Sequence, residues 1–228
     1  DAVNFYKNKN IMNLSFSEKD IFTGATVTSC ILNETVLGSS KIIASELGII
    51  SSNLSYKKNL IQKYQNLTWD DLVECGAISH YKFYSENEEL LIDLYYSIIN
   101  PCVIGKNLFV VDEYDRLINN IGKNDSYLML LNNGFWSFKG SAFSRGGIYD
   151  RFKISQNNIN IRFMYCDYVD VNIYKLKEGI PHFIESGLFI IKDNNFIITE
   201  PWKLELLFAN EVNNIKNFIT LFADYEIP

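Results

Sequence analysis

The hydrophobic pattern of this chain changes near Pro101. Before that residue, apolar side chains recur at helical spacing, whereas after it short runs of β-branched and aromatic residues are separated by turn signals. Chains that segregate helices and strands in this way usually fold as α+β domains. We therefore expect an α+β fold in which a helical first half packs on a mostly antiparallel sheet.

The helix signals fall in four segments of the first half. Residues 26–47 and roughly 54–65 carry apolar side chains at helical spacing. In "LTWDDLVECG", Thr68 precedes an acidic pair, as at a helix N-terminus, and Gly76 marks the end. In residues 85–99, "SENEELLIDLYYSII", the first serine is a candidate cap, and the acidic residues after it suit the first turn of a helix.

Strand and turn signals dominate the second half. Residues 102–111 and 158–176 are rich in β-branched and aromatic side chains, as strands are. Asn133-Gly134 and the residues 193–195 each separate two apolar runs, which predicts two β-hairpins that turn at those positions. The last stretch, 202–222, is predicted to close the chain as a helix.

We expect one domain, 1–228, because no repeat, linker or low-complexity segment divides the chain. The longest apolar runs are far shorter than the roughly 20 residues of a bilayer span, so we expect a soluble chain with no membrane partner, the cytoplasm being slightly favoured. Lys plus Arg number 21 against 27 for Asp plus Glu, a net charge of -6. That balance argues against nucleic acid as a partner.

The cysteines do not form a metal-binding pattern. Cys30, Cys75, Cys102 and Cys166 are widely spaced, and no pair has the Cys-x-x-Cys spacing of a zinc site. We therefore expect no metal and no cofactor. Free thiols are favoured over disulfides, because the spacing is not that of a small disulfide-stapled scaffold.

Three residues are candidates for catalysis. Cys30 lies at the start of a predicted helix, where the backbone N–H groups and the helix dipole favour a nucleophilic thiolate. His182 and Glu200 lie at the two ends of the predicted second hairpin, so antiparallel pairing would bring the carboxylate beside the imidazole. His80 is an alternative base for the cysteine, although a position on a loop or strand surface is the simpler interpretation.

A helix-initiating cysteine, followed far downstream by the stretch "HFIESGLFIIKDNNFIITEP", resembles the papain-like superfamily. It is most similar to the leader-peptide-cleaving cysteine peptidases and the butirosin-type acyltransferases. The resemblance implies cysteine-dependent acyl chemistry on a peptide or acyl-carrier substrate through a Cys-His-Glu arrangement. Cys30 would be the nucleophile that forms a thioester, His182 the base and Glu200 the group that orients the imidazole.

The chain departs from the pattern of that superfamily in two places. Glu200 stands where Asp or Asn is usual, and the glutamine that precedes the cysteine is missing. An oxyanion hole would therefore combine the backbone N–H of Cys30 with the hydroxyl of Thr28 or Ser29. Residues 112–180 are longer than a minimal peptidase needs, and this insertion could be a substrate lid or an interaction surface.

Two functions without catalysis remain open. Residues 39–57 fit a helix-turn-helix with Gly48 at the turn and Lys57 among the lysines that would contact phosphates, which would make the chain a DNA-binding regulator. The acidic charge and the many aromatic residues suit instead a protein-binding function of the immunity or inhibitor type, with a protein as partner.

Overall fold

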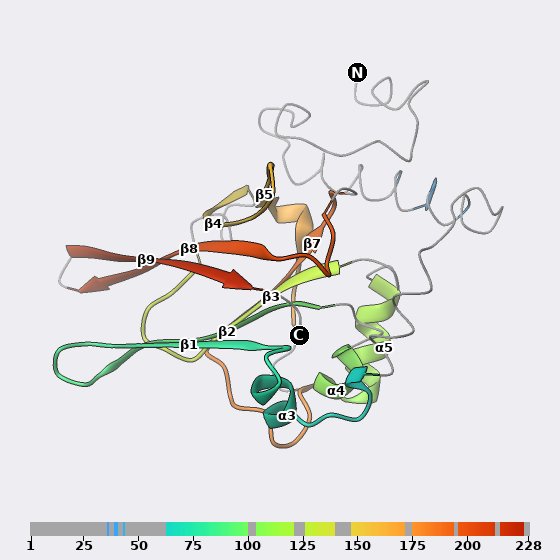
Figure 1. The fold of residues 1–228 in the computed structure, drawn as a ribbon, viewed down its shortest axis with the longest axis horizontal. Coiled ribbons are helices and arrows are strands. Elements are labelled where there is room, and N and C mark those ends of the chain that lie inside the picture. The colour runs from blue at the N-terminus through green and yellow to red at the C-terminus, as the bar shows by residue number, and fades with distance from the viewer. Residues whose placement is uncertain are drawn as a thin grey trace.

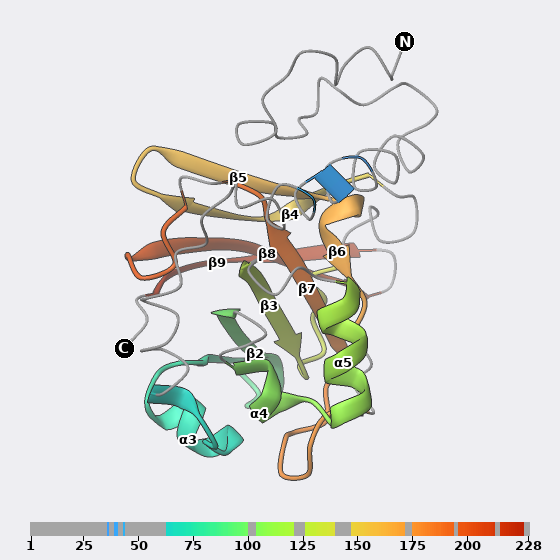
Figure 2. The same cartoon turned by 90° about the vertical axis from the view of Figure 1, so that its right-hand side faces the viewer.

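The computed structural model arranges the described strands in two antiparallel sheets, and helices cover one of these sheets (Figure 1, Figure 2). The described residues are 36, 39, 40, 43, 63–99, 104–120, 126–139, 147–171, 175–193, 196–212 and 215–225. No helix among them is long and apolar enough to cross a bilayer. The expected α+β class with a mostly antiparallel sheet is confirmed, in a strand-rich form.

The five-stranded sheet has the order β1-β2-β3-β7-β6, and the four-stranded sheet has the order β5-β4-β8-β9. All of these pairings are antiparallel. The strands of the first sheet are β1 Ser79–Tyr84, β2 Leu90–Ile99, β3 Ser126–Asn132, β7 Glu185–Ile191 and β6 Tyr168–Val169. Those of the second are β5 Ile159–Met164, β4 Ile148–Gln156, β8 Trp202–Val212 and β9 Ile215–Tyr225.

Helix α3, Trp69–Glu74, is specified by its own first residues. The Thr68 hydroxyl accepts a hydrogen bond from the backbone N–H of Asp71 at 3.2 Å, and the Asp71 carboxylate accepts one from the N–H of Thr68 at 2.8 Å. Gly76 follows with φ at 78°, which glycine adopts without strain. The predicted helix that begins at Thr68 is confirmed. Among the described residues that follow α3, the further helices are α4 Lys106–Leu108, α5 Val111–Asn120 and the 3-10 helix η4 Tyr165–Asp167.

Strand β2 contributes to two hydrophobic cores. Its even-numbered residues from 92 to 98 pack against side chains of the four-stranded sheet. Tyr95 and Ile99, which point the other way, pack with Trp69 of α3 in a second core under the helices. Successive side chains on a strand point to opposite faces, so a strand covered on both sides needs apolar residues at most positions. The five-stranded sheet is thus the middle layer.

The helix predicted over 85–99 is wrong, because residues 90–99 form β2. Ser85 organises the turn before β2: its Oγ accepts hydrogen bonds from the N–H groups of Asn87 at 3.2 Å and Glu89 at 3.1 Å. Serine hydroxyls satisfy backbone N–H groups in turns as well as at helix ends, so this local signal fits both structures. Burial of "LLIDLYYSII" between two layers favours the strand.

Two predictions for the C-terminal part are also wrong. The hairpin predicted around 193–195 does not form, because β7 belongs to the five-stranded sheet and β8 to the four-stranded sheet. The closing helix predicted over 202–222 is instead the antiparallel pair β8–β9, with an unbroken register from Trp202 opposite Tyr225 to Val212 opposite Ile215. Every second residue from Trp202 to Phe208 is buried in the core between the sheets, which is the period of a strand.

The hairpin predicted at Asn133-Gly134 is wrong as well. After β3 the chain continues alongside the first residues of β2, and the N–H of Asn133 donates to the carbonyl of Asp93 at 3.0 Å. A Cβ atom added at Gly134 would lie 2.4 Å from the carbonyl oxygen of Leu91. This glycine is therefore required by a close approach of two backbones and not by a two-residue turn.

The remaining expectations have mixed outcomes. Residues 104–108, within the strand predicted over 102–111, are helical, so that prediction is wrong there. The strands predicted within 158–176 are confirmed as β5 and β6. A helical first half is not confirmed, because β1 and β2 lie in it and the helices predicted over 26–47 and 54–65 fall largely outside the described residues. Within those two ranges, the described residues that are helical are Val36, Ser39, Ser40, Ile43, Lys63 and Tyr64. The single domain and the lid over 112–180 stay predictions.

The hydroxyl of Tyr225 connects the four-stranded sheet to the other two layers. It donates to the carbonyl of Ala77, just before β1, at 2.8 Å and lies 3.3 Å from Oγ of Ser97 on β2. Ser97 donates to the same carbonyl at 2.6 Å. Burial raises the pKa of Tyr225 well above the usual value of a tyrosine.

We predict that Gly134→Ala destabilises the protein by about 1–3 kcal/mol, because the added methyl group meets backbone atoms of β2 that cannot move aside. Gly147→Ala is the matched control, since nothing lies within 4 Å of the corresponding Cβ position. The free energy of unfolding of both variants is measured by denaturant titration. Equal losses for the two variants would contradict the close approach.

We also predict that alkaline unfolding depends on Tyr225. Because its pKa is raised in the folded protein, the stabilisation from this group is complete below about pH 10 and is lost as the pH rises further. Tyr225→Phe should lower stability by about 1 kcal/mol at pH 8 and flatten its decline above pH 10. Ser97→Ala, which keeps the buried phenol, should retain the steep decline in the same denaturant titrations at each pH.

Candidate functional site

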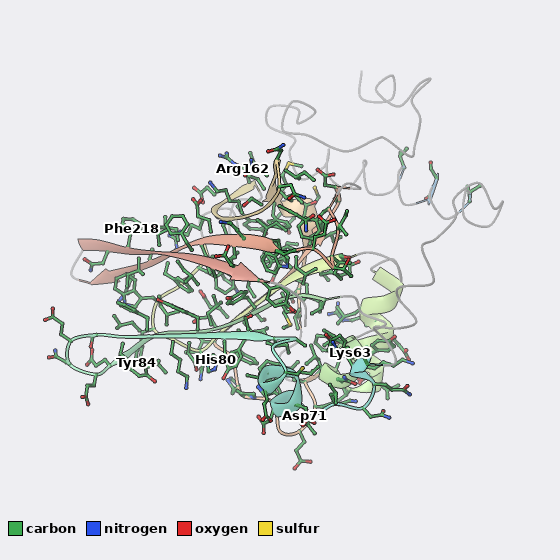
Figure 3. The ribbon with its side chains drawn as sticks, in the orientation of Figure 1. Lys63, Asp71, His80, Tyr84, Arg162 and Phe218 are labelled. Carbon is green, nitrogen blue, oxygen red and sulfur yellow. The ribbon has the colours of Figure 1, made fainter. Side chains whose placement is uncertain are left out.

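A histidine–carboxylate pair lies where β1 meets β2. His80 Nε2 is 2.6 Å from Asp93 Oδ1. The strands pair with His80 opposite Tyr95 and Lys82 opposite Asp93, so His80 and Asp93 are diagonal neighbours on one face of the sheet. Figure 3 labels His80 on this sheet. The side chain of His80 is 24% exposed and that of Asp93 is 11% exposed, which places the pair at the boundary between solvent and core.

Tyr95 forms the base of this site. The imidazole of His80 stacks on the Tyr95 ring, with centroids 3.8 Å apart and an interplanar angle of 10°. Trp69 of α3 and Phe183, just before β7, contact the same ring with centroid distances of 5.1 Å and 5.6 Å. Elements that are far apart in the sequence thus hold the ring in place, and it supports the imidazole.

The backbone of Asp93 is fixed by the last residue of β3. The buried side chain of Asn132 accepts hydrogen bonds through Oδ1 from the N–H groups of Asp93 and Gly134, both at 3.2 Å. Its amide nitrogen donates to the carbonyl of Trp136 at 2.8 Å. The carboxylate of Asp93 is therefore positioned by the fold before any partner binds, as a preorganised site requires.

Burial and the neighbouring charges determine the protonation state of Tyr95 and the chemistry that the site allows. Burial raises the pKa of Tyr95, and the negative charges of Asp93 and Asp70 raise it further. The phenol therefore stays protonated at neutral pH, beside an imidazole that a carboxylate orients. Such an imidazole can exchange a proton or bind a polar group of a partner. Lys82 and Asp70 lie exposed near the pair and contribute opposite charges to its rim.

A second charged cluster joins the end of β7 to η4. Lys192 Nζ lies 2.7 Å from Asp167 Oδ1, and the side chain of Asp167 is 6% exposed. The other oxygen of this carboxylate accepts a hydrogen bond from the N–H of Met164 at 2.6 Å, and Lys192 Nζ is 4.0 Å from Cys166 Sγ. These contacts hold the 3-10 turn against the sheet, which is a structural role. Within the described part of the chain, no group of three metal-ligating side chains occurs.

The structure does not bring His182 and Glu200 together through the expected pairing. His182 is exposed before β7, and Glu200 lies before β8 with its carboxylate accepting a hydrogen bond from Asn157 at 3.2 Å. Because β7 and β8 belong to different sheets, the hairpin that would join these two residues is absent. Cys30, Thr28 and Ser29 lie outside the described residues.

The pair of His80 and Asp93 is not evident from the sequence. The sequence suggests His80 only as an alternative base for the cysteine, on the surface of a loop or strand, and the structure places it on strand β1. Asp93 falls within the wrongly predicted helix over 85–99, where it could not be a cross-strand neighbour of His80. The turn at Ser85 was the sequence signal that could have revealed the pair, because a β-hairpin with its turn there brings His80 and Asp93 close together.

The curated proteins that this chain resembles include two that are named regulatory proteins. Regulatory protein NosR of Stutzerimonas stutzeri is 30% identical over 236 residues, which cover 92% of this chain and 32% of that protein. Regulatory protein NosR of Pseudomonas aeruginosa is 28% identical over 89% of the chain, and Protein NirI of Paracoccus denitrificans is 23% identical over 75%. The chain spans about a third of the length of NosR. No family model and no solved structure matches.

These relatives contradict the papain-like resemblance and the cysteine-dependent acyl chemistry inferred from it. None of the three is named as a hydrolase, thiol protease or acyltransferase, nor as an immunity or inhibitor protein. The pattern that suggested the superfamily included a second strand at residues 196–199, but these residues form no strand, and the next strand, β8, belongs to the other sheet. The helix-turn-helix expected at 39–57 lies outside the described residues, apart from Ser39, Ser40 and Ile43.

We predict that His80 and Asp93 stabilise the fold jointly. A double-mutant cycle with His80→Ala and Asp93→Ala should give a coupling energy of about 1–2 kcal/mol, because the carboxylate is largely shielded from water. The control is the pair Lys153 and Glu205, whose charged atoms are 2.8 Å apart but whose side chains are 35% and 43% exposed. That cycle should give about 0.5 kcal/mol or less. Equal coupling in both cycles would contradict a shielded pair.

Proposed function

We propose that this chain is a regulatory domain of a longer protein, and that it acts by binding a protein partner at the surface around His80. The observation that carries the proposal is the likeness to regulatory protein NosR over 92% of the chain. A likeness that extends over nearly the whole chain favours a shared role for the domain. Because the chain matches only about a third of NosR, the regulated process and the partner are left to experiment.

The construction of the His80 surface supports this choice. Trp69 and Tyr95 are buried aromatic side chains directly beneath a partly exposed imidazole. Binding hot spots are enriched in tryptophan and tyrosine and are surrounded by polar side chains that contribute less energy. Lys82 and Asp70 supply such a charged rim, in which opposite charges select the orientation of a partner.

The proposal is tested in a chimera. The matching third of NosR from Stutzerimonas stutzeri is replaced by this chain, and the transcripts that respond to deletion of NosR are measured by RNA sequencing. We expect the chimera to restore those transcripts. A chimera with Lys82→Glu and Asp70→Lys should restore them less, by about tenfold if the partner loses about 1.4 kcal/mol of binding energy.

The control chimera carries Lys153→Glu on the other sheet and should behave like the unmodified chimera. Circular dichroism of the isolated variants checks that the substitutions in both chimeras leave the fold intact. A folded and normally expressed chimera that restores no transcript would overturn the regulatory proposal. Full restoration by the Lys82 and Asp70 variant would overturn only the assignment of the surface.

A further inference from the structure

Strand β9 forms a long and regular edge of the four-stranded sheet. Within the described part of the chain β9 pairs with β8 alone, and its register has no shift from Ile215 to Tyr225. The other sheet edges are shorter or interrupted: β1 shifts register between Phe83 and Tyr84, β6 has two residues, and the pairing of β5 with β4 is irregular. A long, flat and apolar edge strand is a template for pairing with another strand.

The outward face of β9 carries two exposed phenylalanines. Phe218, labelled in Figure 3, is 54% exposed and Phe222 is 73% exposed. Leu221, whose side chain points to the opposite face, is buried. Thr220 is exposed on the same face as the phenylalanines, and the side chain of Asp224 is 82% exposed. This row is thus not covered by the described part of the protein, although two large apolar side chains in a row are costly to leave in water.

We propose that β9 pairs antiparallel with β9 of a second copy of this chain, about a two-fold axis at Thr220, which joins the two four-stranded sheets into one. In this register Phe218 lies opposite Phe222 of the second copy, and Phe222 lies opposite its Phe218. Thr220 lies opposite its own counterpart. The proposal is independent of the regulatory function proposed above.

The sequence of β9 is complementary to itself in this register. At alternate positions from 216 to 224 the sequence reads Lys, Phe, Thr, Phe and Asp, so the two-fold also places a lysine position opposite an aspartate position at each end. An isologous contact requires this kind of self-complementarity. A shift of the pairing centre by one residue in either direction would instead place a phenylalanine opposite Asp224 or opposite the lysine position, and the aromatic pairs would be lost.

The charge pattern favours a second copy over an unrelated strand. Asp224 already lies 3.5 Å from Lys203 of β8, but both side chains are mostly exposed, at 82% and 74%. The carboxylate therefore remains accessible to a further positive charge. Opposite charges directly across two strands stabilise their pairing, and like charges destabilise it.

The first test is the mass of the protein in solution. Analytical ultracentrifugation from low micromolar to about 0.5 mM should show a reversible dimer with twice the chain mass of 26.4 kDa. Phe222→Lys should weaken the dimer by at least about tenfold, because it places two lysine side chains in the apolar contact. Phe135→Lys is the matched control, since Phe135 is 76% exposed but lies outside β9, and it should leave the dimer unchanged.

The second test fixes the register. Thr220→Cys places two thiols opposite each other at the two-fold axis, so mild oxidation should link the dimer covalently. Glu205→Cys, on the neighbouring strand β8, should give no more cross-linked dimer than the unmodified chain with its native cysteines. A monomer over the whole concentration range, an equal effect of Phe135→Lys, or a dimer in which Thr220→Cys fails to cross-link would each overturn the proposal.

Discussion

The burial of β2 on both faces is the constraint on which the other layers depend. One set of its side chains packs against the four-stranded sheet and the alternate set packs under α3. Because a strand shows its alternate residues to opposite sides, a single register decides both cores at once. A slip by one residue would exchange the two sets and would also move Asp93 away from the side on which His80 lies.

The candidate site is a consequence of that same register. Asp93 belongs to the helix-facing set of β2, yet its side chain is 11% exposed, which places it at the edge of the core. Asn132 fixes its backbone, and Tyr95 supports the imidazole that faces its carboxylate. A polar pair in such a position costs less to desolvate than one in the core, and it remains accessible to a partner.

The likeness to NosR contradicts the papain-like function, and the structure shows that the hairpin on which that function depended does not form. The papain-like resemblance depended on a hairpin between His182 and Glu200, and local sequence supplied two apolar runs with a polar turn between them. The first run forms β7, but residues 196–199 form no strand, and the next strand along the chain, β8, joins the other sheet. Local signals do not specify whether a run becomes a strand or which sheet that strand joins. The strand with which a given strand pairs depends on side chains that lie far away in the sequence.

The sequence by itself determined the α+β class with a mostly antiparallel sheet and some of the elements whose signals are local, whereas the strand-rich first half emerged only in the structure. The cap at Thr68 lies within three residues of its partner, so α3 begins where the sequence predicts. The strand in residues 85–99 and the pair β8–β9 were missed, because turn residues and apolar content fit a helix as well as a strand until burial is known. Only the tertiary structure decided that His80 and Asp93 meet, since their contact depends on cross-strand register.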